Sequence, residues 1–286
     1  MVITVQAALK SMRTYLCGSK PVKPIRTTMK QTEHSIDADI RSKVPAVTFA
    51  FWLIKICATT LGETGGDALS MTLNLGYTIS TVIFFALFLG TAASQVRARA
   101  YHPFLYWGVI VATTTVGTTM SDYLTRTAGL GYVRASVLIF AILTGIFGLW
   151  YFTLGSVSVD RIANPKAEMF YWIAILFSQT LGTALGDSLA DTSGFGYGGG
   201  ALIFAGALTL VAAAYLFTKI SHTALFWLAF ILTRPLGATL GDLLTKPVPS
   251  GGLQLGRISS SLIFVVFIIA AIFFTSRKSE RLSRSV

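Results

Sequence analysis

A pattern of tryptophan, glycine and aspartate recurs four times in this chain, and it limits what the chain can fold into. In each copy the glycine follows the tryptophan by ten residues, and the aspartate follows the glycine by five. The copies are Trp52-Gly62-Asp67, Trp107-Gly117-Asp122, Trp172-Gly182-Asp187 and Trp227-Gly237-Asp242. Each copy lies in an apolar stretch long enough to enter a bilayer, where a carboxylate is costly and usually functional. The pattern therefore predicts a repeated membrane fold that carries acids at one depth.

The apolar residues come in long blocks, and the charged residues lie between them. Only 12% of the 286 residues are charged, against about 25% in a soluble domain. Each block is near the ~20 residues that cross ~30 Å of hydrocarbon, and too long for a barrel strand. We therefore expect an all-α integral membrane protein with eight transmembrane helices. The expected spans are 46–70, 77–94, 104–125, 132–153, 168–189, 199–218, 223–244 and 258–275.

The Lys and Arg residues between the spans predict the orientation. If residues 1–44 are cytoplasmic, most of these bases fall on the cytoplasmic side, and Arg126, Arg134, Lys246 and Arg257 fall outside. The positive-inside rule then places both the N- and C-termini in the cytoplasm. The net charge of +11 is explained by topology and anionic lipid, and not by nucleic acid. We expect a multi-pass protein of the bacterial inner (plasma) membrane.

The four copies divide the chain into helical hairpins. Each hairpin has a motif helix that leads outward, a short outer loop and a plainer helix that returns. Because every repeat uses two spans, all four repeats point the same way, which suggests a ring or two pairs around an axis along the membrane normal. The expected segments are a basic tail at 1–44, repeats at 45–101, 102–165, 166–220 and 221–276, and a basic tail at 277–286.

The motif helices present oxygen atoms along one face. Positions i, i+3 and i+7 of a helix share a face, and in the first repeat these are Thr60, Glu63 and Asp67. Hydroxyls and carboxylates in line are ligands for a hard cation, or steps for a proton. The candidates for cation binding or proton relay are Glu63, Asp67, Asp122, Asp187, Asp242, Thr60, Thr115 and Thr180. Among them, Glu63, Asp67, Asp122 and Asp187 are the expected metal ligands.

Glu63 is the strongest candidate for a relay. Its equivalents in the other repeats are Thr118, Thr183 and Ala238, so the fold does not demand an acid at this position. Acids in or beside the spans, including Asp191, outnumber the two bases in the spans, Lys55 and Arg234. An excess of buried negative charge needs bound cations, protonation or water. We expect Lys55 and Arg234 to act as internal counter-ions, with Arg234 paired to Asp242.

Small residues four apart on these helices predict close helix packing. We assign this role to Gly62, Gly66, Gly117, Gly182, Gly186, Gly237 and Gly241. The tryptophans are expected to be anchors at the membrane interface. An aspartate at the C-terminal end of a helix is opposed by the helix dipole. Either a cation compensates it, or the helix breaks at the glycines and the aspartate caps a second half-helix.

The motif also supports a resemblance to known proteins. The Thr-x-Gly-Glu/Thr-x-x-Gly-Asp helices follow the pairs Phe51-Trp52, Tyr106-Trp107, Tyr171-Trp172 and Phe226-Trp227. They resemble a family of uncharacterised bacterial multi-pass membrane proteins over roughly residues 44–275. The chain also loosely resembles cation–proton exchangers for manganese or calcium that are built on Glu-x-Gly-Asp helices. Here the segment Glu63 to Asp67 has one residue more and occurs once.

These observations favour a membrane transporter or channel for a hard divalent cation such as manganese or calcium. Soft metals would require thiolate or imidazole ligands, which the spans hardly offer. We expect the lipid bilayer and the cation as partners, no tightly bound cofactor and no enzymatic activity, because no CxxC, HExxH, GxSxG or P-loop motif is present. The alternative is a membrane scaffold that does not transport, whose Gly, Asp and Thr residues serve helix packing. A homo-oligomer is also open.

Overall fold

The computed structural model separates residues 1–41 from a compact helical unit that begins at residue 42. It describes residues 43–98, 100–159, 162 and 165–283. The predicted basic tail therefore lies almost wholly outside the described residues, and so do residues 284–286.

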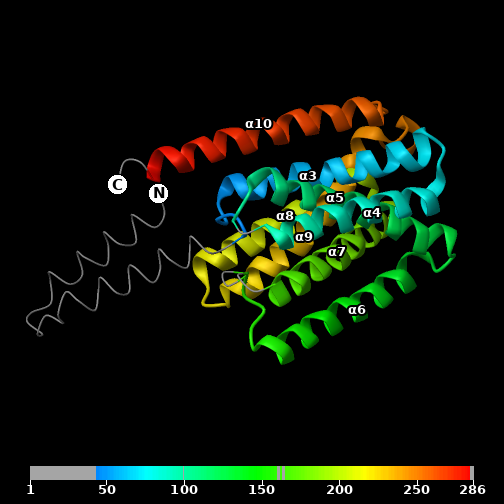
Figure 1. Ribbon diagram of the computed structural model, residues 1–286. Coiled ribbons are helices and arrows are strands. Elements are labelled where there is room, and N and C mark those ends of the chain that lie inside the picture. The colour runs from blue at the N-terminus through cyan, green and yellow to red at the C-terminus, as the bar shows by residue number, and fades with distance from the viewer. Residues whose placement is uncertain (1–42, 99, 160–161, 163–164, 284–286) are drawn as a thin grey trace, which may run out of the picture. The chain divides into compact units, whose positions relative to one another are not determined.

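The described residues form helices and no strand, as predicted (Figure 1). Short π-helices follow the first three motif helices, η1 (Ala68–Thr72), η2 (Tyr123–Thr127) and η4 (Ser188–Thr192), and a 3-10 turn, η5, spans Val248–Ser250. The α-helices are α3 (Phe49–Asp67), α4 (Gly76–Arg97), α5 (Pro103–Asp122), α6 (Gly131–Leu154), α7 (Pro165–Asp187), α8 (Gly196–Phe217), α9 (His222–Thr245) and α10 (Arg257–Ser283). Helix α10 continues past residue 276, so residues 277–283 of the predicted tail are helical.

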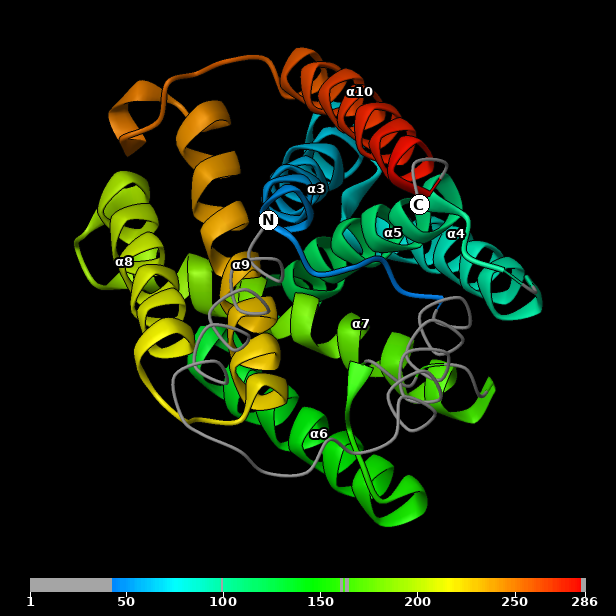
Figure 2. The ribbon, with the colours of Figure 1, turned by 90° about the vertical axis from the view of Figure 1, so that its left-hand side faces the viewer.

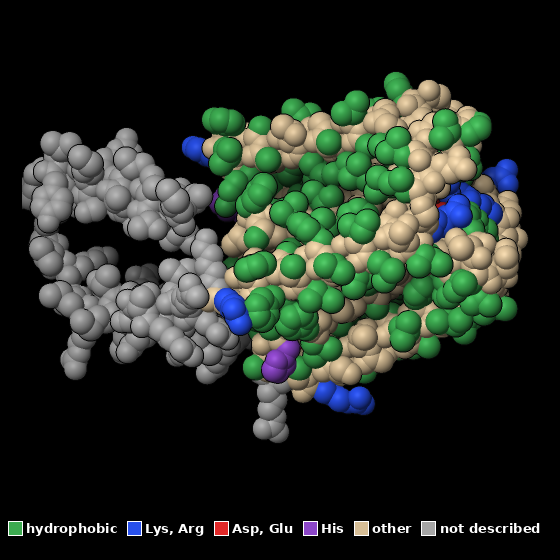
Figure 3. Space-filling view, turned by 90° about the horizontal axis from the view of Figure 1, so that it is seen from above, with side chains coloured by type: hydrophobic (Ala, Val, Ile, Leu, Met, Phe, Trp, Pro, Cys, Tyr) green, Lys and Arg blue, Asp and Glu red, His purple; other side chains and the backbone are tan. Residues whose placement is uncertain are grey.

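Six helical segments in the described part are long and apolar enough to cross a membrane: α4, α6, α7 with η4, α8, α9, and α10 as far as Arg277. The other two motif helices, α3 and α5, are less apolar, because α3 carries Lys55, Glu63 and Asp67 and α5 is rich in threonine. Hydrophobic side chains are spread over the face seen in Figure 3, and few charged side chains interrupt them. The chain is thus a membrane protein with transmembrane helices and internal repeats.

The four motif helices form a closed ring at the centre of the unit (Figure 2). Helix α3 packs on α5, α5 on α7, α7 on α9, and α9 packs back on α3. Each returning helix packs mainly on the motif helix of the next repeat: α4 on α5, α6 on α7, α8 on α9 and α10 on α3. Consecutive repeats therefore interlock, and α10 joins the last repeat to the first.

Glycines determine the spacing of the ring. The motif glycine of each repeat faces the residue that lies three positions before the motif glycine of the next repeat. The facing pairs are Gly62 and Thr114, Gly117 and Gln179, Gly182 and Arg234, and Gly237 and Thr59. A Cβ at Gly237 would lie only 2.2 Å from Thr59 Oγ1, so the contact that closes the ring is the tightest of the four. One turn later Gly66 faces Thr118 in the same direction, so α3 and α5 run parallel.

The helices do not break at the motif glycines. Helix α3 runs without interruption from Phe49 to Asp67, and the Asp67 side chain makes no capping hydrogen bond to the π-helix that follows. Positive charge must therefore compensate the unfavourable interaction of Asp67 with the negative end of the helix dipole. The returning helices begin at Gly76, Gly131 and Gly196, which have φ angles of 73°, 70° and 63°. Only glycine adopts this left-handed backbone without strain.

The end of the ring that carries the four tryptophans, here called the tryptophan end, is filled with aromatic side chains. Trp107, Trp172 and Trp227 are buried, so the prediction that they are interfacial anchors is wrong for these three. The indole of Trp227 donates a hydrogen bond to the Val157 carbonyl, and the Tyr106 and Tyr171 hydroxyls lie 2.7 Å apart. Aromatic contacts between neighbouring motif helices thus close the core at this end.

Candidate cation site between α3 and α9

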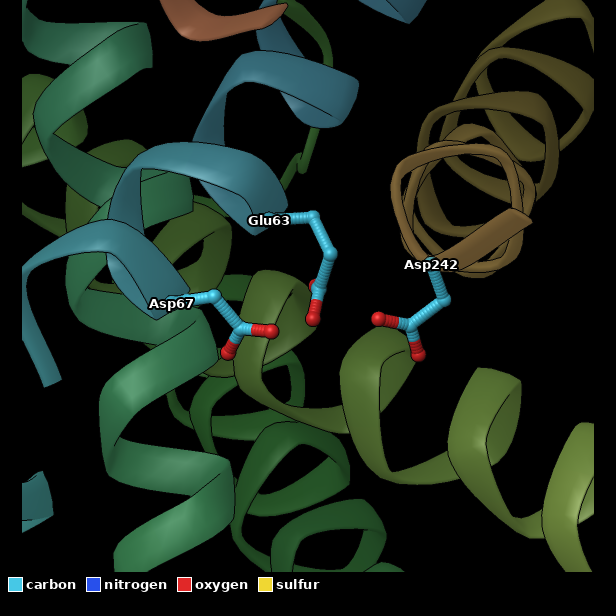
Figure 4. A group of neighbouring side chains, drawn as sticks. All are labelled: Glu63, Asp67 and Asp242. Atoms are coloured by element: carbon cyan, nitrogen blue, oxygen red, sulfur yellow. The ribbon is translucent and has the colours of Figure 1, made fainter. Parts of the chain in front are cut away.

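Three buried carboxylates converge at the opposite end of the ring, here called the aspartate end because it carries Asp67, Asp122, Asp187 and Asp242. Glu63 and Asp67 extend from α3 and Asp242 extends from α9, and their carboxylates point toward a shared space (Figure 4). One oxygen from each lies within 4.8 Å of the others. Oxygens that bind calcium at ~2.4 Å on opposite sides of the ion are separated by about the same distance. The first and last repeats together therefore offer a ligand set for one cation.

The close approach of α9 to α3 makes this convergence possible. A Cβ at Gly241 would lie 2.7 Å from Glu63 Cβ, so no larger residue fits between the helices without a shift. Glu63, Asp67 and Asp242 are each at most 3% exposed. The Oδ1 atom of Asp67 has no hydrogen-bond partner in the described structure. An unpaired carboxylate oxygen in a dry site is costly, and a bound cation would satisfy it.

Arg234 binds Glu63 and does not bind Asp242, which corrects the expected pairing. Its Nη2 atom donates to Glu63 Oε2 at 2.8 Å and to Thr118 Oγ1 at 2.6 Å, so this one side chain links α9 to α3 and α5. Asp242 follows Arg234 by eight residues on α9, which is ~12 Å along a helix at ~1.5 Å per residue. That separation places the two side chains at different depths.

Lys55 has a different environment from the predicted one. Its ammonium nitrogen is fully buried, has no hydrogen-bond partner in the described structure, and lies 3.9 Å from the centre of the Phe230 ring. The ring face attracts a cation. No acid forms an ion pair with Lys55 within the described residues, so its predicted role as a counter-ion is wrong there.

Two bases outside the spans complete the charge pattern beside the three carboxylates. Lys246 Nζ lies 3.2 Å from Asp67 Oδ2 and 3.2 Å from Asp242 Oδ1, and Arg257 Nε lies 3.5 Å from Asp67 Oδ2. Burial lowers the pKa of Lys246, but the neighbouring Asp242 and Asp67 carboxylates raise it by more than burial lowers it. The net pKa therefore lies above the ordinary value for lysine. Sequence reasoning missed these partners, although Lys246 follows Asp242 at the spacing of one helical turn.

The opposite side of the aspartate end, between α5 and α7, holds the other two motif aspartates. Arg126 lies 3.2 Å from Asp122 Oδ1 and 3.5 Å from Asp187 Oδ2. Asp191 accepts a hydrogen bond of 2.6 Å from the Tyr132 hydroxyl, and Asp187 Oδ1 has no hydrogen-bond partner among the described residues. Asp122 and Asp187 do not belong to the group of three carboxylates. The expected metal ligands are thus divided between two sides of the ring, and Asp242 joins Glu63 and Asp67 instead.

The threonines singled out from the sequence bond to their own helices. The hydroxyls of Thr60, Thr115 and Thr180 donate to backbone carbonyls three or four residues earlier. Thr118 is the threonine beside Glu63 and Arg234, and it also donates to the Gly62 carbonyl. The predicted excess of acids is also smaller than expected, because Arg126, Lys246 and Arg257 pair with the aspartates.

Comparison with known proteins identifies the repeat but no activity. A family model described as Repeat of Unknown Function (DUF347) matches four segments, residues 50–101, 105–156, 170–221 and 225–281. These segments make up more than half of the chain, and each contains one copy of the motif. No curated protein and no solved structure matches the chain.

Proposed function

The chain belongs to the DUF347 family of repeats of unknown function, and from this premise we propose that it is a membrane transporter for a hard divalent cation. The cation binds to Glu63, Asp67 and Asp242 at the aspartate end of the ring. The observation that carries the proposal is the convergence of these three buried carboxylates within 4.8 Å. They come from repeats at opposite ends of the chain, so the site exists only when the ring is closed.

The donor atoms support a hard ion. All three ligand groups supply oxygen, which is preferred by calcium, magnesium and manganese. Glu63 is the one acid at its repeat position, since the other repeats place Thr118, Thr183 and Ala238 there. The fold therefore forms the same helix contacts without an acid at this position, which favours a functional role for Glu63.

The bases along the ring favour a carrier over an open channel. Arg234 lies two helical turns from Asp242 toward the tryptophan end, and Lys55 lies two turns from Glu63 in the same direction. A cation that moved along the ring axis would meet two buried positive charges and then the aromatic side chains, and like charges in a narrow path oppose its passage. Transport then requires a rearrangement of the ring, and we expect the cation to reach the site from the aspartate end.

We place this end outside the cytoplasm. The distribution of Lys and Arg in the sequence favours cytoplasmic N- and C-termini. In this arrangement α3 and α5 also cross the membrane, which makes eight spans, because they lie beside α7 and α9 in the ring and have similar lengths. Their polar faces point to neighbouring motif helices, so lipid does not contact them.

Flux into liposomes tests the proposal. The full chain is reconstituted, and uptake of manganese or calcium is followed beside Asp242→Asn and the control Asp187→Asn. Asp242 is chosen because Glu63 also holds Arg234, so a change at Glu63 mixes stability with ion binding. We expect uptake by the wild type and by Asp187→Asn, and its loss in Asp242→Asn with an unchanged amount of folded protein. Equal uptake by Asp242→Asn would remove the site from the mechanism.

The scaffold is the second candidate, and one observation favours it. Each of the four motif aspartates lies within 3.5 Å of Lys246, Arg126 or Arg257, as structural ion pairs would. If this is the function, no ion is taken up, and each Asp→Asn change lowers stability by a similar amount whether or not ions are present.

A further inference from the structure

The segment that joins α9 to α10 places two bases, Lys246 and Arg257, beside the carboxylates of the candidate site. We infer that Lys246 and Arg257 act as built-in competitors that make the site selective for divalent over monovalent cations. This inference rests on the proposed function, because it concerns the same carboxylates. It adds that Lys246 and Arg257 decide whether a divalent or a monovalent cation binds there.

The ammonium of Lys246 lies where a bound cation would interact with two of the three acids. It is 3.2 Å from both Asp67 Oδ2 and Asp242 Oδ1, and Arg257 approaches Asp67 Oδ2 from the start of α10 at 3.5 Å. A cation that takes Asp67 Oδ2 and Asp242 Oδ1 as ligands competes with Lys246 for the same two oxygens, because positive charges at this distance repel one another.

The charges balance in a way that favours a divalent ion. In their ionised forms Glu63, Asp67 and Asp242 carry three negative charges, and Arg234, Lys246 and Arg257 carry three positive ones. Arg234 is fully buried and stays with Glu63. A divalent cation replaces the combined charge of Lys246 and Arg257. A monovalent cation replaces only one tethered base with the same charge, so it gains little and loses its hydration shell.

Displacement of these two side chains does not require the backbone to move. The side chains of Lys246 and Arg257 are 12% and 23% exposed, so each has access to solvent. The segment between them is held to α9, since the Leu253 amide donates to the Leu243 carbonyl and the Leu255 amide donates to the Leu244 carbonyl. Long side chains at the edge of a site turn outward readily, whereas the segment itself stays in place.

The chain offers a matched control on the other side of the ring. Arg126 follows Asp122 at the same spacing as Lys246 follows Asp242, and it bridges two motif aspartates in the same manner. Because Asp122 and Asp187 are outside the group of three carboxylates, removal of Arg126 changes a similar ion pair without altering the candidate site.

The test uses the full chain purified in detergent at constant ionic strength. The midpoint of thermal unfolding is measured against manganese, calcium, sodium and potassium for the wild type, Lys246→Met, Arg257→Met and Arg126→Met. In the wild type and Arg126→Met, only divalent ions should raise the midpoint. In Lys246→Met and Arg257→Met the divalent ions should act at about tenfold lower concentration, and sodium or potassium should now raise the midpoint too.

Each outcome is decisive. Weaker or unchanged divalent binding in both Lys246→Met and Arg257→Met, with no response to monovalent ions, would overturn the inference while the cation site remained. An equal gain in Arg126→Met would also overturn it, because a general change in surface charge would then explain the result. If no ion stabilises any of the four proteins, the cation site and this inference fail together. Arg257→Met keeps the test valid if Lys246→Met does not fold.

Discussion

The two sides of the aspartate end carry the same repeat positions but differ in what they can bind. Between α9 and α3, Asp242 and Asp67 share Lys246, and Glu63 brings a third carboxylate to the same space. Between α5 and α7, Asp122 and Asp187 share Arg126 in the same way, but Thr183 stands where the first repeat has Glu63. The repeat thus supplies pairs of aspartates bridged by a base, and one departure from the repeat turns one pair into a candidate cation site.

The largest expected effect concerns Arg234, which lies two helical turns from Asp242 toward the tryptophan end. Arg234→Met leaves Glu63 buried without its ion pair, which should cost about 3–5 kcal/mol of unfolding free energy. Gln179 occupies the same repeat position on α7, and its amide atoms are buried without hydrogen-bond partners in the described structure. Gln179→Met should therefore be neutral or stabilising. Denaturant unfolding in detergent measures the free energy of unfolding of both variants. Similar losses would mean that the ion pair of Arg234 with Glu63 contributes no more to stability than Gln179 does.

A second carboxylate group should form if the missing acid is restored. Thr183→Glu places an acid near Asp187 that has no equivalent of Arg234 to pair with, so we expect a loss of roughly 3 kcal/mol without ions. Divalent ions should recover much of this loss, because a cation can now bind at this side as well. Unfolding with and without manganese measures the recovery. A loss that manganese does not change would show that Glu63 alone does not make the difference between the sides.

Stabilisation by a divalent ion should depend on Asp67 and not on Asp122. With a divalent ion at 100 times its dissociation constant, the wild type gains about 2.7 kcal/mol. Asp67→Asn should lose this gain, whereas its equivalent Asp122→Asn should keep it. Titration of the unfolding midpoint with manganese checks both variants. Loss of the gain in Asp122→Asn would extend the ligand set to the other side of the ring.

The smallest expected effect concerns the contacts between helices. Gly237→Ala should cost about 1–3 kcal/mol by overpacking, because the added Cβ would lie 2.2 Å from Thr59 Oγ1. Gly117→Ala should cost less, since its Cβ would lie 2.8 Å from Gln179 Cβ. Gly145 on α6 has nothing within 4 Å of an added Cβ, so Gly145→Ala serves as the control and should be harmless. A reversed order for Gly237 and Gly117 would contradict the tighter closure between α9 and α3.

Features that depend on neighbours in the chain were accessible from the sequence. The helices, the four repeats and the membrane character follow from the length and hydropathy of each block, which are local properties. Burial of the motif acids also follows from their place in those blocks. The sequence pattern was misleading for the tryptophans, because an interfacial belt and an aromatic core produce the same spacing of Trp107, Trp172 and Trp227 along their helices.

Features that depend on contacts through space were not accessible. Nothing in the spacing reveals that α4 packs mainly on α5, or that α10 returns to α3. The sequence predicts a pair of Arg234 with Asp242 in the fourth repeat, yet the partner of Arg234 is Glu63 in the first. The sequence places Lys246 and Arg257 among the charges of an outer loop, although the closed ring brings them to Asp67.

The sequence alone determined which segments form apolar helices and how often the motif recurs, because hydrophobic length and repeat spacing are properties of the chain itself. Only the tertiary structure decided which acids meet. Four parallel motif helices contact one another through glycines in one common register, and the contact of Gly237 with Thr59 closes the ring. Glu63 and Asp242 lie more than half the chain apart in sequence, and this closure brings their carboxylates together.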